Sequence, residues 1–530
     1  MSNPVLLLLL SLPLLLFHTP LPVSAASSSS SSDSPTYLWP LPSKFSSGVE
    51  TFSIDPTLSL SVSGNGGSSR IVKEGFDRYK SIIFKNSDVF SILSTFRKKR
   101  TLYDVVNLNV IVHSASEDLQ LGVDESYSLA VGRSDNLSIM GEATIEAATV
   151  FGALRGLETF SQLCTFDYAS KTVLIHNIPW NIQDEPRFKY RGLLLDTSRH
   201  YFPVDVIKHI LESMTFAKLM NKHFLLRCHH ILSYGKVHTQ NGSAIQLRMP
   251  MKLSRINVMA EVDVPGHAES WGKGYPDLWP SSSCREPLDI TKNFTFELIS
   301  GILSDMRKIF PFELFHLGGD EVNTDCWTDT PHVKQWLQKR NMTNKEAYKY
   351  FVLKAQNIAI SRGWTPVNWE ETFNTFPESL NPKTVVHNWL GPGVCPKAVA
   401  KGFKCIFSNQ GVWYLDHLDV PWYKVYNAEP LEGISDPSKQ ELVLGGEVCM
   451  WGETIDTSNV QQTIWPRAAA AAERLWSRKD ATSGDSANTT ALLRLQYFRC
   501  LLNGRGVQAA PVTNFYARNQ PEGPGSCYDQ

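Results

Sequence analysis

From residue 190 onward the sequence repeats one pattern, and this pattern restricts the possible folds more than any other feature of the chain. Short runs of almost continuously apolar residues end in polar or charged residues, and helical segments separate successive runs. Strands that are buried on both faces and alternate with helices are typical of parallel α/β structure. The runs cover residues 192–196, 256–263, 312–321, 365–371, 384–389, 404–409 and 442–453, with helices at 204–218, 294–309 and 345–362.

These seven runs are one short of the eight strands of a closed (β/α)8 TIM barrel. We therefore expect the missing strand between Arg199 and Ile256. Polar residues gather at the C-terminal ends of the runs, where barrel enzymes build their active sites because the βα loops meet there. The sequence thus predicts an α/β fold with a catalytic barrel at residues 183–505, followed by a C-terminal extension at 506–530.

Residues 37–182 show a different pattern of apolar residues. Strand-like runs at 107–113, 127–131 and 137–140 accompany one helical stretch at 144–164, which predicts a smaller α+β domain before the barrel. A chain of 530 residues is long enough for two such domains.

The first 25 residues have the features of a secretory signal peptide. An apolar run is interrupted by Pro13 and is followed by Val23-Ser24-Ala25, a small-residue cleavage pattern. The alternative is a membrane anchor, but the run is shorter than the ~20 residues that a span requires, so we expect no stable membrane span. A Ser-rich linker at 26–36 follows. We expect entry into the secretory pathway, with vacuole, lysosome and cell exterior all open as destinations.

Export predicts glycans and disulfides. Glycosylation sequons occur at Asn136, Asn293, Asn341 and Asn488, with a fifth at Asn241. The chain has nine cysteines, and an odd count means at least one free thiol. The charge is nearly balanced, 51 Lys and Arg against 52 Asp and Glu, so it supplies no electrostatic footprint for nucleic acid.

The segment 316–321, His-Leu-Gly-Gly-Asp-Glu, ends one of the predicted strands. Its glycines permit a tight turn. Adjacent carboxylates cannot flank a bond as in hydrolases whose two carboxyls stand ~5–9.5 Å apart, but Asp320 and Glu321 can serve two atoms on one side of a substrate. Repulsion between them predicts a raised pKa for one, which favours a proton-holding acid. The alternative is a helix N-cap with an exposed Glu.

Aromatic residues follow several of the same strands. One tryptophan is more often a core residue than a ligand contact, but three at successive strand ends reverse that expectation. Aromatic walls with a few carboxylates suit a pyranose ring, whose C–H faces stack and whose hydroxyls need donors and acceptors. The residues are Trp369, Trp389 and Trp451, with Tyr414, Asp416 and Glu453 in the same loops.

A metal site is the competing chemistry. Histidines on different strands, together with Asp263 and Asp320, could supply four ligands. No local pair has ligand spacing, so we expect no metal, and the sequence implies no organic cofactor. The histidines are His200, His267, His316 and His387.

Taken together, these segments resemble glycoside hydrolase family 20, and specifically its lysosomal and plant-type β-N-acetylhexosaminidases. The resemblance extends from residue 37 to 527. It implies retaining cleavage of N-acetylhexosamine-terminated glycans, and a homodimer as an open expectation because family members often dimerise. The matching segments are RGLLLDTSRHY at 191–201, AEVDVPGHAESW at 260–271, HLGGDE at 316–321, WYLD at 413–416 and CMWGE at 449–453.

The resemblance also implies roles for individual residues. Glu321 is the general acid/base, Asp320 steadies the substrate's 2-acetamido N–H, and Tyr414 donates to the acetamido oxygen, which is the nucleophile. This substrate-assisted reaction is an exception to the rule of two flanking carboxylates. The remaining implied roles are pocket walls for Trp369, Trp389 and Trp451, hydroxyl binding for Arg199, Asp416 and Glu453, support for His267, and disulfides Cys284–Cys326 and Cys500–Cys527.

Residues 221–254 depart from the family, which has a strand, a loop and a helix there. A shifted reading frame can spell family-like phrases, and Met249-Pro250 and Met251-Lys252 force Ala and Glu in that frame. We hypothesise an out-of-frame translation, from a splice variant or a faulty gene model; the alternative is real divergence. A barrel without a proper second strand leaves two unpaired edges. We therefore expect poor folding or inactivity, and a sugar-binding pseudoenzyme is the alternative function.

Overall fold

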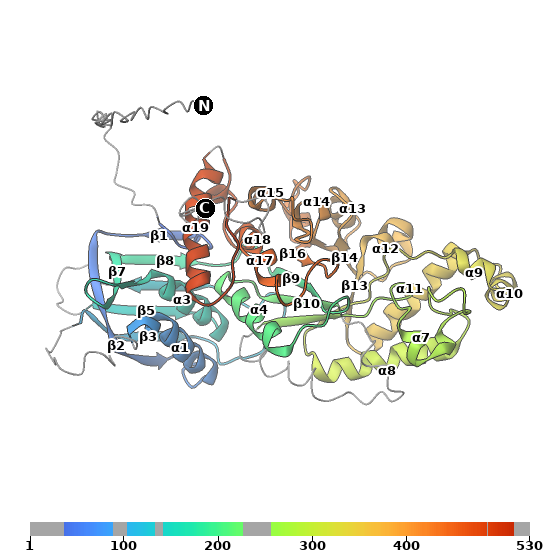
Figure 1. Ribbon diagram of the computed structural model, residues 1–530, viewed down its shortest axis with the longest axis horizontal. Coiled ribbons are helices and arrows are strands. Elements are labelled where there is room, and N and C mark those ends of the chain that lie inside the picture. The colour runs from blue at the N-terminus through green and yellow to red at the C-terminus, as the bar shows by residue number, and fades with distance from the viewer. Residues whose placement is uncertain (1–35, 88–102, 133–140, 226–255, 485, 514–530) are drawn as a thin grey trace, which may run out of the picture. The chain divides into compact units, whose positions relative to one another are not determined.

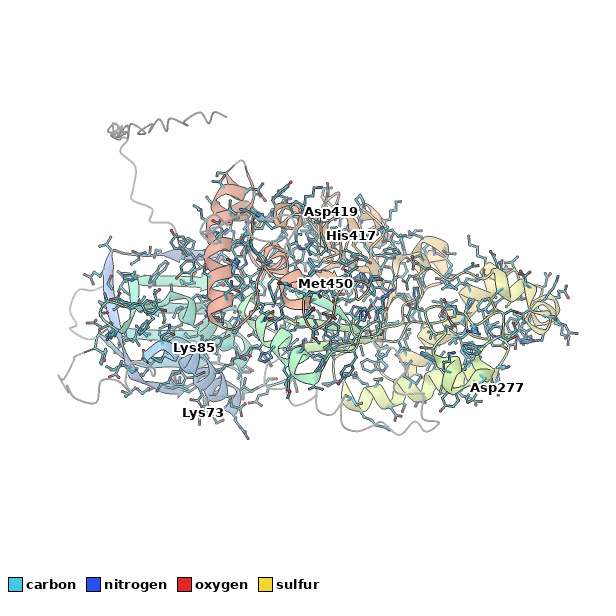
Figure 2. The ribbon with its side chains drawn as sticks, in the orientation of Figure 1. Lys73, Lys85, Asp277, His417, Asp419 and Met450 are labelled. Atoms are coloured by element: carbon cyan, nitrogen blue, oxygen red, sulfur yellow. A yellow bond between two sulfur atoms is a disulfide. The ribbon has the colours of Figure 1, made fainter. Side chains whose placement is uncertain are left out.

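The computed structural model describes residues 36–87, 103–132, 141–225, 256–484 and 486–513. Within these ranges the chain forms an eight-stranded sheet followed by a closed barrel of parallel strands (Figure 1). The sheet ends at Asp184 and the first barrel strand begins at Tyr190. Charged side chains such as Lys73 and Asp277 lie at the surface, whereas Met450 is buried (Figure 2).

The first sheet has the strand order β1-β8-β4-β5-β3-β2-β7-β6. Helices α1 (Arg70–Ile83) and α3 (Val150–Leu163) pack against it and against each other. Every residue of α3 is buried, since this helix also contacts segments near the C-terminus. The strands are β1 Lys44–Ser46, β2 Glu50–Ser63, β3 Val105–Val112, β4 Tyr127–Val131, β5 Gly141–Ala147, β6 Cys164–Asp167, β7 Thr172–Ile178 and β8 Trp180–Asp184.

The helix predicted at 144–164 is wrong in its first turn and a half. Residues up to Ala147 belong to strand β5, and α3 begins at Val150 after Thr149, whose side chain accepts from the N–H groups of Phe151 and Gly152. The reason is a period of two, because Ala143, Ile145 and Ala147 are buried and the residues between them are not. Helix α1 was not predicted from the sequence, and the strand-like run predicted at 137–140 lies outside the described residues.

The barrel has the strand order β10-β11-β12-β13-β14-β15-β16-β9, and all neighbouring strands are parallel. Each of the seven predicted runs overlaps one strand, and only β9 begins before its run. The strands are β9 Tyr190–Asp196, β10 Asn221–Leu225, β11 Asn257–Glu261, β12 Leu314–His316, β13 Thr365–Trp369, β14 Val385–Asn388, β15 Lys404–Phe407 and β16 Val443–Met450.

The eighth strand, expected between Arg199 and Ile256, is β10, which confirms the closed barrel, but the expectation of two unpaired edges is wrong. Strand β10 pairs over its whole length with β9 on one side and β11 on the other, so neither neighbour has an open edge. Its residues nevertheless fit the interior poorly. Lys222 is fully buried and its Nζ has no hydrogen-bond partner among the described residues, and the same holds for both side-chain polar atoms of Asn221. Residues 226–255 lie outside the described ranges.

The three predicted barrel helices are α4 Val204–Phe216, α8 Asn293–Ile309 and α11 Asn344–Ser361, each within two residues of its predicted bounds. No helix in the described ranges is long and apolar enough to cross a membrane. The other helices are α7 Trp271–Gly274, α9 Asp325–Asp329, α10 Pro331–Lys339, α12 Glu370–Thr375, α13 Val394–Ala400, α14 Gln410–Trp413, α15 Trp422–Asn427, α16 Pro437–Gln440, α17 Val460–Ile464, α18 Arg467–Trp476 and α19 Ala487–Gly504, with 3-10 turns at Pro276–Leu278, Pro377–Ser379 and Asp480–Thr482.

Buried charges join the sheet to the barrel. Glu125 binds Arg191 of β9 at 2.7 Å and Arg155 of α3 at 2.8 Å. Lys218, just after α4, binds Asp184 of β8 at 2.8 Å. All five side chains are almost completely buried, so each charge depends on its partner for the solvation that it has lost.

Two disulfides occur in the described residues. Cys284 is bonded to Cys326, the pair that the family resemblance implies, and Cys395 is bonded to Cys405, a pair that the sequence analysis did not assign. The implied partner of Cys500, Cys527, lies outside the described residues. Of the sequons, Asn293, Asn341 and Asn488 are exposed, whereas Asn136 and Asn241 lie outside the described ranges.

Candidate active site

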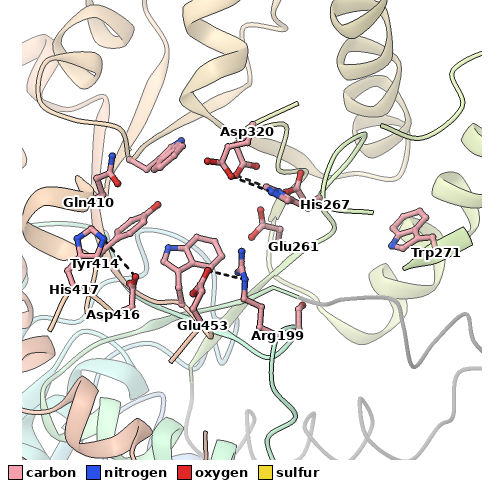
Figure 3. Close-up of a pocket in the computed structure, with 15 residues that line it drawn as sticks. Arg199, Glu261, His267, Trp271, Asp320, Gln410, Tyr414, Asp416, His417 and Glu453 are labelled. Atoms are coloured by element: carbon pink, nitrogen blue, oxygen red, sulfur yellow. Dashed lines mark hydrogen bonds and ion pairs between the residues drawn. The ribbon is translucent and has the colours of Figure 1, made fainter. Parts of the chain in front are cut away.

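A pocket opens at the C-terminal ends of the barrel strands (Figure 3). Its volume of about 180 Å³ is below the roughly 300–1,000 Å³ of sites that take drug-sized ligands, which suits a single sugar ring better than an extended chain. Its lining consists of Ser198, Arg199, Glu261, Asp263, His267, Trp271, Asp320, Glu321, Trp389, Gln410, Tyr414, Asp416, His417, Trp451 and Glu453.

The loop after β12 carries the two adjacent acids. Gly318 and Gly319 have φ values of 62° and 94°, and a Cβ on Gly318 would lie 1.8 Å from Oδ1 of Asp263, so only glycine fits there. The Gly319 N–H donates to that same Oδ1 at 2.8 Å, and Asn368 Nδ2 donates to the Gly318 carbonyl at 3.0 Å. The turn expected from the sequence thus brings the loop directly against β11 and β13.

Asp320 and Glu321 have different surroundings. Asp320 is buried, and Oδ1 has no hydrogen-bond partner in the described part of the chain, whereas the Glu321 side chain is 59% exposed. Burial, followed by the charges of Asp263 and Glu261, raises the pKa of Asp320 well above its usual value. The raised pKa expected from the sequence is therefore present, but burial is its main cause and Asp263 and Glu261 are the nearby acids.

His267 connects the acids of the pocket. Its Nδ1 lies 2.7 Å from Asp263 Oδ2 and 3.8 Å from Asp320 Oδ2, while Nε2 lies 3.4 Å from Glu321 Oε2. The hydrogen bond with Asp263 raises the pKa of His267 to about 9. An imidazolium therefore faces the loop of Asp320 and Glu321 at neutral pH.

Arg199 lies on the opposite side of the pocket. Its guanidinium binds Asp196 Oδ2 at 2.6 Å and Glu453 Oε1 at 3.0 Å, and it stands 5.2 Å from the centre of the Trp451 ring. Asp196 also accepts from the Gly452 N–H at 3.1 Å, which holds the loop after β16 against β9. The predicted Arg199 and Glu453 are thus brought together at one edge.

Aromatic rings form another wall. Trp389 and Tyr414 stack at 6.2 Å with an angle of 10° between their planes, and Trp451 lies 5.9 Å from Tyr414. Burial raises the pKa of Tyr414 well above its usual value and also that of Asp416. Asp416 Oδ1 and Trp451 Nε1 are buried and lack a hydrogen-bond partner within the described ranges. One acceptor and one donor at the pocket therefore remain for a polar ligand.

Trp369 differs from expectation, because it lies beneath the pocket and not on its surface. It is 1% exposed, donates from Nε1 to Glu261 Oε1 at 3.0 Å and stacks on His387 at 4.1 Å. The ring forms part of the floor, together with Leu194 and Cys449.

Several lining residues had no assigned role in the sequence analysis: Ser198, Glu261, Trp271, Gln410 and His417. Glu261 and Trp271 belong to the matching segment 260–271, and Glu261 ends strand β11. The same strand-end signal that indicated Trp369 and Asp320 could therefore have indicated Glu261. Gln410 begins the short helix α14 and His417 lies in the loop after it, and strand patterns give no such signal for either.

Three clusters in the described chain could hold a metal ion, with ligand atoms within 4.8 Å of one another. Two lie in the barrel interior, where His223 binds Glu261 at 3.1 Å and Glu447 at 2.8 Å. His200, one of the histidines considered as a ligand, instead places Nδ1 2.5 Å from the Gly452 carbonyl. The clusters are His223, Glu261 and His316; His223, His387 and Glu447; and Asp263, His267 and Asp320.

Acids beside tryptophans in a pocket of this size, at the C-terminal mouth of a closed barrel, are suited to cleavage of a sugar bond, so fold and site together define a glycosidase. Comparison with known proteins narrows this class. Residues 188–228 and 250–479 match the catalytic domain of glycosyl hydrolase family 20, and residues 38–163 match a domain described as beta-acetyl hexosaminidase like. The chain belongs to glycosyl hydrolase family 20.

Individual relatives match this sequence along almost the whole chain. Beta-hexosaminidase 1 of Arabidopsis thaliana is 65% identical, covering 94% of this chain and 95% of the relative, and human beta-hexosaminidase subunit beta is 31% identical, covering 91% and 90%. The Flavobacterium johnsoniae chitobiase structure has a TM-score of 0.75 at 27% identity, covering 89% of this chain and 73% of that one. The family match omits residues 229–249, which lie inside the aberrant segment proposed from the sequence.

Proposed function

We propose that this glycosidase is an exo-acting, retaining β-N-acetylhexosaminidase that removes terminal GlcNAc or GalNAc from glycans. The observation that supports this most strongly is the difference between two neighbouring acids: Asp320 is buried with an unpaired Oδ1, and Glu321 is exposed at the pocket. Two acids on one side of a substrate suit a reaction in which the substrate supplies the nucleophile.

In the proposed reaction the oxygen of the 2-acetamido group attacks the anomeric carbon. Glu321 donates its proton to the glycosidic oxygen as the C–O bond breaks, and the aglycone leaves as an alcohol. Asp320 accepts from the acetamido N–H, and Tyr414 donates to the acetamido oxygen. Glu321, now a carboxylate, then takes a proton from the water that opens the oxazolinium ring, so the anomeric configuration is retained.

The remaining lining residues would bind the sugar. Trp389 and Trp451 offer aromatic surfaces for the C–H faces of the ring, and Asp416 Oδ1 and Trp451 Nε1 are the unpaired groups that a hydroxyl could satisfy. Arg199 and Glu453 would bind further hydroxyls from their shared edge. His267 would support Glu321 through its charge, and Trp369 would support the floor.

The test is hydrolysis of a chromogenic aryl N-acetyl-β-glucosaminide by the full chain and by Glu321→Gln. We expect turnover by the full chain and a loss of about 10²–10⁴-fold in kcat for the variant, because the proton donor is removed while the shape is kept. A variant that still binds the sugar but does not cleave it supports the proposal. Equal rates for both proteins would favour the pseudoenzyme.

A second protein, in which residues 221–254 are replaced by a family-like strand, loop and helix, tests that segment separately. Turnover only after the replacement would mean that the active site is complete but the segment prevents the native state. Equal turnover in both would overturn the expectation of an inactive chain.

The comparisons also support a location. The Arabidopsis thaliana and human relatives match over more than nine-tenths of the chain, which supports entry into the secretory pathway and delivery to a vacuole, a lysosome or the cell exterior. We propose that residues 1–25 are a signal peptide and that Asn293, Asn341 and Asn488, which are exposed, carry glycans. Cleavage at the predicted site is checked by N-terminal sequencing of the mature protein.

A further inference from the structure

Glu371 is the second residue of helix α12, which begins directly after the strand that ends in Trp369. Its carboxylate accepts from the indole Nε1–H of Trp389 at 2.9 and 3.1 Å. The backbone N–H of Glu321 also faces this carboxylate and lowers its pKa. One half-buried side chain behind the pocket thus touches both an aromatic wall and the acid loop.

The preceding residue, Glu370, binds the backbone of this region and not the Trp389 ring. Its Oε2 accepts from the backbone N–H groups of Trp389 at 2.7 Å and Leu390 at 3.1 Å, and from Asn388 Nδ2 at 2.6 Å. Glu370 therefore fixes the backbone after β14, whereas Glu371 fixes the direction of the Trp389 ring. The two adjacent acids hold different parts of the same residue.

Glu321 needs an external anchor. Its φ of 51° lies in the left-handed region, which costs a non-glycine residue conformational energy and persists only where neighbours hold it. Its side chain is 59% exposed, so packing alone does not fix it. The Glu371 carboxylate that faces its N–H acts at the strained peptide and helps to set the position from which the Glu321 carboxyl reaches a substrate.

The local charges are consistent with a strong acceptor that titrates near neutrality. Burial raises the pKa of Glu371 to about 7, and the Trp389 hydrogen bond opposes that rise. The groups that face it are the carboxylates of Glu370 and Asp320 and the phenol of Tyr348. Above this pKa the charged carboxylate makes stronger hydrogen bonds than a neutral amide could.

We propose that Glu371 is a positioning residue for the glycosidase reaction, which fixes the Trp389 ring and the Glu321 peptide relative to each other. The inference rests on the function proposed above. Glu371 is separate from the groups that line the pocket, so it acts through Trp389 and Glu321 and does not touch the substrate itself.

The test compares Glu371→Ala and Glu371→Gln with the full chain on an aryl N-acetyl-β-glucosaminide. For Glu371→Ala we expect a loss of about 100-fold in kcat/KM, the size of effect that a displacement of about 1 Å in a catalytic group produces. Glu371→Gln keeps one acceptor oxygen and should retain about a tenth of the activity or more. The matched control is Glu378→Gln, which removes the same charge from an exposed position nearby.

A double-mutant cycle with Trp389→Phe separates positioning from a general loss of structure. If Glu371 acts through the indole N–H, its effect on KM should disappear in the Trp389→Phe background, while its effect on kcat through Glu321 remains. Unchanged kinetics in Glu371→Ala would overturn the inference. So would a double mutant whose loss in kcat/KM equals the product of the losses in the two single mutants. Absence of turnover in the full chain would overturn the proposed function instead, so the two failures are distinguishable.

Discussion

At the scale of single residues, the pocket sets protonation through burial and specific partners. Asp320 gains a raised pKa mainly because it is buried, and His267 gains one because Asp263 accepts its hydrogen bond. The two raised pKa values favour opposite states of charge, a neutral acid and a charged imidazole. Burial favours neutral Asp320, whereas Asp263 favours charged His267, so a cation stands beside two acids whose electrostatic environments differ.

The raised pKa of His267 predicts how stability depends on pH. The charged imidazole contributes stability that is fully present below the unfolded pKa of ~6.5 and is lost as pH rises through about 9. The stability difference between the full chain and His267→Gln should therefore be up to ~3 kcal/mol near pH 6 and shrink by pH 10. Denaturant unfolding at pH 6, 7.5 and 10 measures it. A difference that stays constant over this range contradicts the prediction, and His209→Gln, at an exposed position, is the control.

At the scale of elements, β10 lies in the interval where the count of barrel strands predicted it, although its own residues show no clean strand pattern. Its neighbours β9 and β11 offer unpaired backbone groups on both sides, and pairing with both closes the barrel. The energetic cost of this pairing is the burial of polar side chains. Asn221 and Lys222 are buried without hydrogen-bond partners among the described residues, and burial lowers the pKa of Lys222 well below its usual value. These unsatisfied groups support the hypothesis that the natural strand has other residues.

Replacing Lys222 with an apolar residue should therefore stabilise the protein. For Lys222→Val we expect a gain of about 1–3 kcal/mol in the free energy of unfolding, since a buried unpaired polar group costs that much. The same change at Lys345, which is exposed, should stay within ~0.5 kcal/mol. Urea unfolding of both variants is the measurement, and a loss of stability in Lys222→Val would show that the amine is solvated in the native state.

Sequence patterns predicted the elements whose burial is regular. Seven barrel strands and three long helices follow from apolar runs and helical spacing, and Asp320, Glu321, Tyr414 and Trp451 follow from strand ends. The patterns failed where tertiary contacts decide, as at β10, at the Cys395–Cys405 bond and at Trp369, whose depth depends on His387 beneath it. Glu371 could not be assigned because its partners, Trp389 and Glu321, come from other loops.

At the scale of the whole molecule, buried ion pairs connect the first sheet to the barrel. Arg191 is the second residue of the first barrel strand and shares Glu125 with Arg155, while Lys218 shares Asp184 with the indole N–H of Trp476. Burial alone would raise the pKa of Glu125, but the two guanidiniums overcome it and lower the pKa instead. The sheet and the barrel are therefore expected to unfold together.

Glu125→Gln tests this connection. It leaves two buried guanidiniums without their carboxylate, which should cost about 3–5 kcal/mol. Thermal unfolding followed by circular dichroism should shift to lower temperature, and a second, earlier transition would show that the sheet has separated from the barrel. Glu146→Gln, in the same sheet but half-exposed, should leave the curve almost unchanged. An unaltered midpoint for Glu125→Gln would mean that the pair does not join the two parts.

The floor formed by Trp369 and the histidines beneath it closes the pocket from below. Among the described residues no other exit is open, so a liberated monosaccharide leaves by the route through which it entered, and the shortened glycan blocks that route until it departs. Such an enzyme cannot slide along a polymer from one cut to the next. It must release the shortened glycan after every cleavage. Trimming of a long glycan would therefore be distributive, and intermediates of every length would accumulate.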